Sequence, residues 1–421
     1  MTDPAHWRDL GPGIYLHIPF CRRRCGYCDF ASTTGDAAAR NAFVADLLAE
    51  IRLVAAGGDF ADETFRTIFL GGGTPSLLEG DQMNRILGAL RDSFAVTPDA
   101  EVTMEANPES LEPERLDAFL RGGGNRVSLG IQSLDDAALR LLDRAHDAAL
   151  ARHRAGELKE RRVSFSVDLI YGLPGLDTTA WGTALDGAIE LGADHLSAYL
   201  LTLEPGTPMH VAVATGELTL PGEEEARAQY ELLVDRTSAA GLSCYEISNF
   251  ARPGLESRHN QNYWVRGEYL GLGPSAHSHH GGWRWANEPD PGAWSRAVQA
   301  GGGASWGMPR EAGGSYREMS EAADCPILFR ERVSGREAAA EWIFLGLRRT
   351  EGVPWDLLAT AAGDGAAALE RRTGFLAEQG LLERQDGWLR LARAGRFVSD
   401  AIFADLMAAM EDPVPVDGTR R

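Results

Sequence analysis

Short apolar runs alternate with segments of helical periodicity along the first half of this 421-residue chain. Alternation of this kind predicts parallel strands joined by right-handed helical crossovers, and therefore an α/β fold. Six such units are too few for a closed eight-stranded barrel and indicate an open, partial one. The predicted strands are Ile14–Ile18, Thr67–Leu70, Val102–Glu105, Arg126–Gly130, Ser164–Ile170 and His195–Leu200. The predicted helices are Ala42–Val54, Asp81–Ser93, Pro113–Leu120, Asp135–Leu142 and Thr179–Leu191.

Polar residues and glycines gather where these predicted strands end. Cys21 follows the first strand, Gly71–Pro75 follows the second, Glu105 ends the third, Gln132 follows the fourth and Asp168 lies in the fifth. Barrel enzymes place their chemistry at the carboxyl ends of the strands. The pattern therefore predicts one shared site at that end of the barrel.

The composition excludes several classes of protein. A net charge of −20 argues against a nucleic-acid surface and against an anionic membrane surface, since both require clustered Lys and Arg. No stretch approaches the roughly 20 apolar residues of a membrane span, and the first residues lack the pattern of a secretory signal. Three of the five cysteines fall within eight positions, as metal ligands do in a reducing compartment. We therefore expect a cytoplasmic protein without stable membrane insertion.

The C-terminal part predicts a smaller module. Residues 301–325 are Gly-rich and aperiodic, which indicates a linker between a domain at 1–300 and a second at 326–421. Helices separated by an Asp386–Gly387 hairpin suggest a winged-helix-like fold. The acidic charge favours a packing or substrate-covering role over DNA binding. The predicted elements are helices Arg336–Arg348, Trp355–Ala361, Gly365–Gln379 and Ala394–Met410, and the hairpin Leu381–Leu391.

The strongest motif is the C-x3-C-x2-C run formed by Cys21, Cys25 and Cys28. Three thiolates leave one iron of a [4Fe–4S] cluster open to an external ligand. The alternative is a zinc site that uses the same cysteines and His17. We favour the cluster because neither Cys244 nor Cys325 has a C-x2-C companion to complete a zinc site.

The glycine run that follows the second predicted strand fits the same interpretation. The bare backbone of Gly72 and Gly73, followed by Thr74, allows close approach to a ligand such as the amino group of S-adenosylmethionine (SAM). A tight strand–helix connection is the alternative for this run taken alone.

Together these motifs resemble the radical SAM superfamily, and within it the oxygen-independent coproporphyrinogen oxidase-like branch that contains the HemN and HemW types. The resemblance runs from Tyr15 to the C-terminal module and implies a partial (β/α)6 barrel followed by a small, mainly helical domain. The segments that carry it begin with the cysteine run and continue with Gly71–Ser76, Glu105–Ser110, Ser128–Ser133, Asp168–Gly175 and Leu203–Pro208.

The resemblance also implies roles for single residues. Cys21, Cys25 and Cys28 would bind the cluster, and Tyr15 would pack against the cluster or SAM. The remaining SAM-site residues would be Phe30, Gly72, Gly73, Thr74, Glu105, Gln132, Arg144 and Asp168. Carboxylates and an amide suit ribose hydroxyls, and Arg suits a carboxylate.

Two features favour the HemW type over the HemN type. Phe30 stands where the HemN type has a fourth cysteine, and only 20 residues precede Cys21. Residues 259–264 match the HNxxYW motif proposed for haem binding, which makes His259 the candidate axial ligand. A hydrogen-bonded structural histidine is the alternative, and His277 is the next candidate ligand.

The resemblance therefore implies a haem chaperone that passes haem to an acceptor haem protein, such as a respiratory enzyme. It also implies an electron donor such as flavodoxin, and it is compatible with a homodimer. The alternative is an oxygen-independent coproporphyrinogen III oxidase that uses a 5′-deoxyadenosyl radical in porphyrin biosynthesis. A third interpretation is radical SAM chemistry on an unrelated substrate. Whether the chain is an enzyme stays undecided at this point.

Overall fold

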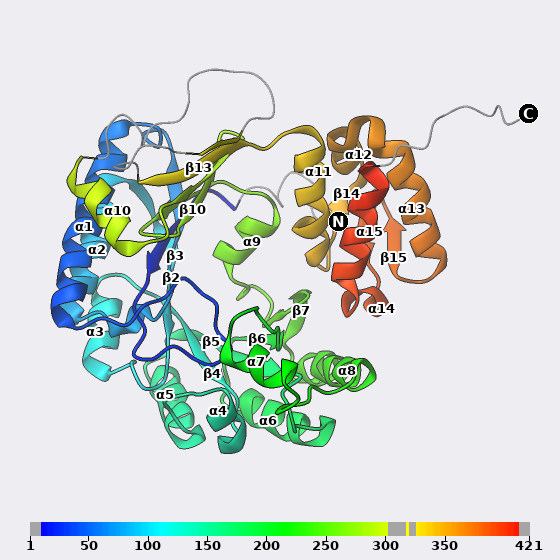
Figure 1. Cartoon of the computed structure of the whole chain (residues 1–421), viewed down its shortest axis with the longest axis horizontal. Coiled ribbons are helices and arrows are strands. Elements are labelled where there is room, and N and C mark those ends of the chain that lie inside the picture. The colour runs from blue at the N-terminus through cyan, green and yellow to red at the C-terminus, as the bar shows by residue number, and fades with distance from the viewer. Residues whose placement is uncertain (1–9, 302–316, 320–325, 412–421) are drawn as a thin grey trace, which may run out of the picture.

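The computed structural model describes residues 10–301, 317–319 and 326–411. Figure 1 shows a large domain built around a curved sheet, with a smaller, mainly helical domain beside it. No helix among the described residues is both long enough and apolar enough to cross a membrane.

Six parallel strands form the centre of the large domain in the order β1-β2-β3-β4-β5-β6. This arrangement confirms the predicted α/β partial barrel. Each predicted strand is present, and several extend beyond the predicted bounds. The strands are β1 (Gly13–Ile18), β2 (Thr64–Gly72), β3 (Ala95–Ala106), β4 (Arg126–Gln132), β5 (Ser164–Tyr171) and β6 (His195–Leu200).

Helices cover the outer face of these strands, and Figure 1 shows them surrounding the sheet. They are α1 (Ala37–Gly57), α2 (Gly80–Ser93), α3 (Pro113–Arg121), α4 (Asp136–Leu141), α5 (Ala148–Glu160), α6 (Thr178–Glu190) and α8 (Glu223–Ala239). Helix α7 (Pro208–Ala214) instead contacts the loop after β1, where the backbone nitrogen of Met209 donates to the carbonyl of Gly26 at 2.9 Å. Aspartates cap several helices. Asp147, for example, accepts a hydrogen bond from the backbone nitrogen of Leu150 at 2.8 Å at the start of α5.

The sheet continues past both edges of the barrel and has thirteen strands within the described part of the chain. Beyond β6 lie β8 (Asn249–Ala251) and β7 (Ser243–Glu246), and beyond β1 lie β9 (Tyr269–Leu272), β10 (His277–His280), β11 (Trp283–Asn287), β13 (Ile327–Arg332) and β12 (Arg317–Met319). Strand β9 is parallel to β1, whereas β10, β11, β13 and β12 are each antiparallel to their neighbours. Two further helices belong to this part of the chain, α9 (Arg258–Trp264) and α10 (Pro291–Gln299).

The first core lies between the strands and the outer helices. Ile14, Leu16 and Ile18 alternate along β1 and are completely buried against the helices. The intervening residues Tyr15 and His17 therefore point to the opposite face, toward the interior of the barrel. Burial of alternate apolar residues sets the register that brings these two polar side chains inside.

The C-terminal domain has its own hydrophobic core around Trp342, Leu358 and Leu406. The predicted hairpin is confirmed, since Asp386 and Gly387 have φ angles of 52° and 80°, as a type I′ turn requires. The predicted helix Ala394–Met410 is instead two helices. The elements are α11 (Gly335–Phe344), β14 (Val353–Pro354), α12 (Trp355–Ala362), α13 (Ala366–Glu378), β15 (Leu382–Gln385), β16 (Trp388–Leu391), α14 (Arg393–Arg396) and α15 (Ser399–Glu411).

The Gly-rich stretch at 301–325 lies mostly outside the described residues. Within it, β12 pairs with β13, and β13 pairs with β11 of the large domain. The large sheet therefore extends beyond residue 300, and β13 belongs to it although it lies within the expected second domain at 326–421.

Candidate functional site

A cavity of about 420 Å3 opens where the parallel strands end. Every predicted cluster or SAM residue except Tyr15 lines it. They come from the loop after β1, the ends of β2 to β5 and the segment after α4. The parallel strands thus bring together residues that are far apart in the sequence, as barrel geometry requires.

The three cysteines lie on the loop that follows β1. Cys21, Cys25 and Cys28 are free thiols that line this cavity. The loop is held at its start, because the backbone nitrogen of Cys21 donates to the carbonyl of Thr33 at 2.8 Å. Burial raises the pKa of the Cys28 thiol. A positively charged metal group would reverse this effect by stabilising the thiolate.

Arg144 connects this loop to the strands. Its guanidinium donates to Cys25 Sγ at 3.4 Å, to Asn107 Oδ1 at 2.5 Å and to the carbonyl of Gly130 at 2.9 Å. Asn107 in turn donates to Thr74 Oγ1 at 3.1 Å, and that hydroxyl lies 3.6 Å from Cys21 Sγ. Asn107 belongs to the Glu105–Ser110 motif, but its role as a bridge between Arg144 and Thr74 is visible only in three dimensions.

Two buried carboxyl groups face the interior of the cavity. Glu105 Oε2 accepts a hydrogen bond from the backbone nitrogen of Gly72 at 3.1 Å. Burial, together with the nearby Asp168, raises the pKa of Glu105 to about 8. Burial also raises the pKa of Asp168, which accepts from Ser128 Oγ at 3.0 and 3.1 Å. Both groups have acceptor oxygens suited to the hydroxyls of a polar ligand.

The backbone around the cavity adopts conformations that are rare elsewhere. Gly72 has a φ angle of 103°, and Gln132 and Asp143 have φ angles of 62° and 58°. A side chain on Gly73 would meet the carbonyl oxygen of Phe20 at 2.7 Å, so only glycine fits there. Asp143 has its left-handed conformation at the end of α4, where its backbone nitrogen donates to the carbonyl of Arg140 at 3.1 Å.

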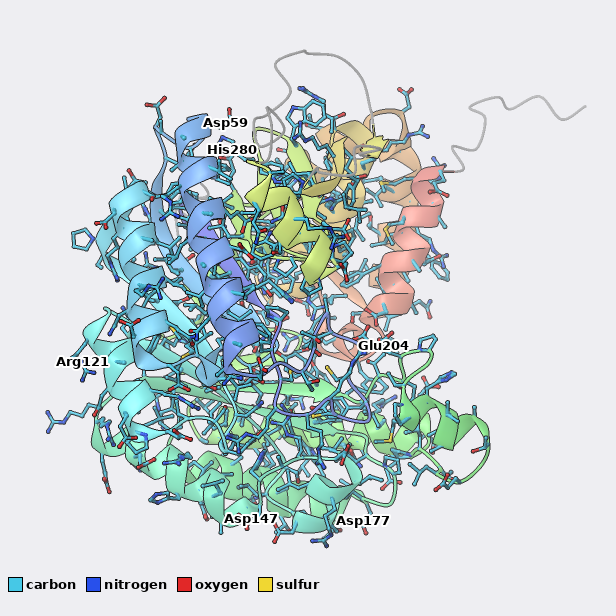
Figure 2. The ribbon with its side chains drawn as sticks, turned by 60° about the vertical axis from the view of Figure 1, so that its left-hand side comes forward. Asp59, Arg121, Asp147, Asp177, Glu204 and His280 are labelled. Atoms are coloured by element: carbon cyan, nitrogen blue, oxygen red, sulfur yellow. The ribbon has the colours of Figure 1, made fainter. Side chains whose placement is uncertain are left out.

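Exposed apolar residues border the mouth of the cavity. Phe30 is 63% exposed, and Tyr199 and Leu200 of β6 are also exposed. Glu204, on the loop after β6, lies at the same mouth, and Figure 2 shows it well apart from His280 of β10. The mouth thus offers apolar surface beside the cysteine loop.

Tyr15 lines a second cavity of about 390 Å3 on the side of the barrel toward β9 and β10. The two cavities share no lining residue among those described. His17 stands between them: it lines the second cavity, and a Cβ on Gly72 would meet its ring at 2.5 Å. Tyr15 was expected to pack against the cluster or SAM, whereas the structure places its ring in the second cavity.

His259 is completely buried at the start of α9. Its Nδ1 is 2.7 Å from Thr67 Oγ1, its Nε2 is 2.8 Å from the Tyr263 hydroxyl, and its ring stacks on Phe69. Both ring nitrogens are therefore hydrogen-bonded within the protein. Burial lowers the pKa of His259 to about 3, so the ring is neutral. His259 thus has the surroundings of a hydrogen-bonded structural histidine, which was the alternative to a haem ligand.

Comparison with known proteins agrees with this architecture. The radical SAM superfamily model matches residues 15–185, and the HemN C-terminal domain model matches residues 333–398. A Mycobacterium tuberculosis protein named heme chaperone HemW is 38% identical over 94% of each chain. The heme chaperone HemW of Bacillus subtilis is 31% identical over 94% of this chain and 99% of its own. This chain belongs to the HemW family of radical SAM proteins.

A solved structure shows the same fold. Coproporphyrinogen III oxidase (HemN) from Escherichia coli matches 96% of this chain and 93% of its own, with a TM-score of 0.76. The two sequences are 20% identical, so this likeness concerns the fold alone.

A mitochondrial radical S-adenosyl methionine domain-containing protein 1 from Bos taurus is 34% identical over 95% of this chain and 88% of its own.

Proposed function

We propose that this chain is a haem chaperone, which binds haem and delivers it to an acceptor haem protein. The observation that carries this proposal is the 38% identity to a heme chaperone HemW over 94% of both chains. Identity spread over the whole length includes the barrel, the sheet extension and the C-terminal domain. A respiratory haem enzyme is the acceptor that we propose, and a flavodoxin is the proposed electron donor.

The residues of the first cavity fit a [4Fe–4S] cluster and SAM. Three free thiols line it, and buried Arg144 has an Nε without a hydrogen-bond partner in the described structure. We propose that Cys21, Cys25 and Cys28 hold the cluster. When bound, the cluster supplies one-electron chemistry at the sulfonium of SAM.

The remaining lining residues bind and orient the SAM molecule in this proposal. The backbone of Gly72 and Gly73, with Thr74, faces its amino-acid part. Glu105, Gln132 and Asp168 offer hydrogen-bond acceptors to the polar groups of SAM. Arg144 donates a hydrogen bond to Cys25 and places positive charge beside the carboxylate of SAM. Phe30, at the mouth of the cavity, contacts SAM in this proposal.

The experiment that tests the proposed function measures transfer. The full chain is reconstituted anaerobically with iron and sulfide, loaded with haem, and mixed with an acceptor haem protein in its apo form. We expect the acceptor's own haem spectrum to appear faster than with the same concentration of free haem. Equal rates in the two samples would contradict the chaperone.

A second assay separates the chaperone from the oxidase. The reconstituted protein is incubated with coproporphyrinogen III, SAM and a reductant, and the products are analysed by mass spectrometry. We expect no loss of propionate carboxyl groups. Repeated turnover would identify the chain as an oxidase and would overturn the proposal.

A further inference from the structure

Three side chains of the kinds that bind metal ions meet at the edge of the sheet where the parallel strands begin. Glu63 lies one residue before β2, Glu268 lies one residue before β9, and His280 ends β10. Strands β9, β1 and β2 are parallel neighbours, so β9 and β2 begin at the same edge. Strand β10 is antiparallel to β9 and therefore brings His280 back to that edge.

The side chain of His280 lies on the face of β10 opposite the second cavity. Successive residues of a strand point to opposite faces, and His277 and His279 line that cavity, whereas His280 does not. The His280 ring instead packs against Phe60, with the ring centroids 4.7 Å apart. Glu63 and Glu268 line neither of the two cavities either. The three side chains therefore form a cluster outside the sites described above.

The atoms of this cluster that could bind a metal ion converge. Nδ1 of His280 is 2.8 Å from Glu268 Oε2 and 3.9 Å from Glu63 Oε1. Each residue offers one ligand atom, and these atoms lie within 4.8 Å of one another. In a tetrahedral zinc site with bonds of about 2.0–2.2 Å, neighbouring ligand atoms are about 3.3–3.6 Å apart. The two measured distances lie on either side of this range, so small movements of the flexible glutamate side chains complete the geometry.

Negative charge exceeds positive charge in the cluster. Within the described part of the chain, neither Glu63 nor Glu268 pairs with Lys or Arg, so the two carboxylates share the imidazole of His280. Asp59 adds a further carboxylate whose charge acts on His280, and Figure 2 shows these two residues at the same end of the molecule. A protonated imidazole balances one of these negative charges, whereas a divalent ion beside a neutral imidazole balances two.

Contacts around the cluster orient the ligands and leave the cluster open to solvent. The backbone nitrogen of Gly281 donates to Glu268 Oε1 at 2.9 Å, while Oε2 faces the imidazole. The side chains of His280, Glu63 and Glu268 are 14%, 28% and 38% exposed. An ion can therefore enter from solvent and keep a water molecule as its fourth ligand, as in zinc sites with three protein ligands.

We propose that Glu63, Glu268 and His280 bind a divalent transition-metal ion of the zinc class. One imidazole and two carboxylates suit Zn²⁺, whereas Mg²⁺ and Ca²⁺ prefer ligand sets made of oxygen atoms. The proton on Nδ1 of His280 is released to solvent when the ion binds. The ion joins the start of β2 in the barrel to β9 and β10 in the extension of the sheet. This site goes beyond the proposed function and does not depend on it.

The test is a zinc titration of the untagged, full-length protein by isothermal titration calorimetry. The protein is first reconstituted anaerobically with iron and sulfide, because free thiols would otherwise bind zinc. We expect one Zn²⁺ per chain, and a dissociation constant at least 10-fold higher in His280→Ala and in Glu63→Gln. With Mg²⁺ in place of Zn²⁺ we expect no measurable binding at the same concentrations. Zinc should also raise the melting temperature of the wild type but not of the two variants.

The matched control is His153→Ala. Nε2 of His153, which is exposed on α5, lies 3.8 Å from Glu157, so this variant also removes a His–Glu ion pair. We expect it to keep the wild-type affinity for zinc. Absence of a zinc site in the wild type, unchanged affinity in either His280→Ala or Glu63→Gln, or an equal loss in the control would each overturn the proposal. Circular dichroism and iron content verify that each variant is folded, and none of these outcomes bears on haem transfer.

Discussion

The hydroxyl of Tyr15 donates a hydrogen bond to Nδ1 of His17, 3.0 Å away. The direction follows from the other ring nitrogen, since His17 Nε2 is 2.7 Å from the carbonyl oxygen of Ala31, which only accepts. Ala31 lies three residues after Cys28, so this chain of contacts joins the cysteine loop to the second cavity. No described residue lines both cavities, but these hydrogen bonds of Tyr15, His17 and Ala31 connect them.

Replacement of Tyr15 with Phe removes the donor and keeps the ring. Nδ1 of His17 then remains buried without a partner, which costs about 1–3 kcal/mol of stability. We expect a lower urea midpoint, measured by tryptophan fluorescence, with the iron and sulfide content of the reconstituted protein unchanged. Thr202→Ala, on an exposed loop, serves as the control. An unchanged midpoint in Tyr15→Phe would show that the hydrogen bond does not stabilise the fold.

Replacement of Cys21 with Ser is expected to abolish incorporation of the four-iron cluster. A hydroxyl at this position is a poorer ligand for iron than a thiolate, and among the described residues three cysteines line the first cavity. The measurement is iron and sulfide content after anaerobic reconstitution, with absorbance at about 400 nm. Cys244→Ser is the matched control, because Cys244 is a free thiol on β7 that does not line this cavity. A full complement of iron in Cys21→Ser would overturn the ligand assignment.

The parallel strands of the barrel could be predicted because apolar residues recur in each short run, as Ile14, Leu16 and Ile18 do in β1. The strands β10 and β11 were not predicted. Their sequences, His277–His280 and Trp283–Asn287, mix polar and aromatic residues because one face borders the second cavity and the other packs against the large domain. Helix α5 was missed for a related reason, since Ala151, Ala155 and Leu158 form a buried face too small to give a clear apolar period.

The surroundings of His259 could not be inferred from its neighbours in the sequence. Its partner Thr67 lies 192 residues away on β2, and only the closure of α9 against β1 and β2 brings the two together. Tyr263 and Trp264 of the same motif line the second cavity. Burial of the histidine depends on tertiary packing, which no local pattern encodes.

Haem binding is expected to survive loss of the cluster. The two cavities have no lining residue in common among those described, and Tyr263 and Trp264, which belong to the motif that the resemblance associates with haem, line the second. A variant with Cys21, Cys25 and Cys28 all changed to Ser should therefore bind haem with an affinity within about threefold of the wild type. The measurement is a haem titration of purified protein without iron or sulfide. A complete loss of binding would place haem at the cysteine loop instead.

The buried carboxyl of Glu50 is expected to make stability depend on pH. It accepts hydrogen bonds from the backbone nitrogen of Gly273 at 2.7 Å and from Asn287 Nδ2 at 2.9 Å, and no cation pairs with it in the described structure. Burial raises its pKa to about 8 from the ordinary value of 4.5. The folded state thus holds a proton that the unfolded state releases. The resulting stability is fully present below about pH 4.5 and is lost as the pH rises through about 8.

We therefore expect the melting temperature of the protein to fall between pH 6 and pH 8.5, and the Glu50→Gln variant to show a smaller fall. The amide cannot ionise, so it removes the pH-dependent cost, although its NH2 group opposes the N–H of Gly273 and lowers stability at every pH. The measurement is differential scanning fluorimetry across this pH range at constant ionic strength. Glu160→Gln, on the exposed end of α5, is the matched control and should keep the wild-type slope. The same slope in Glu50→Gln as in the wild type would show that another group causes the pH dependence.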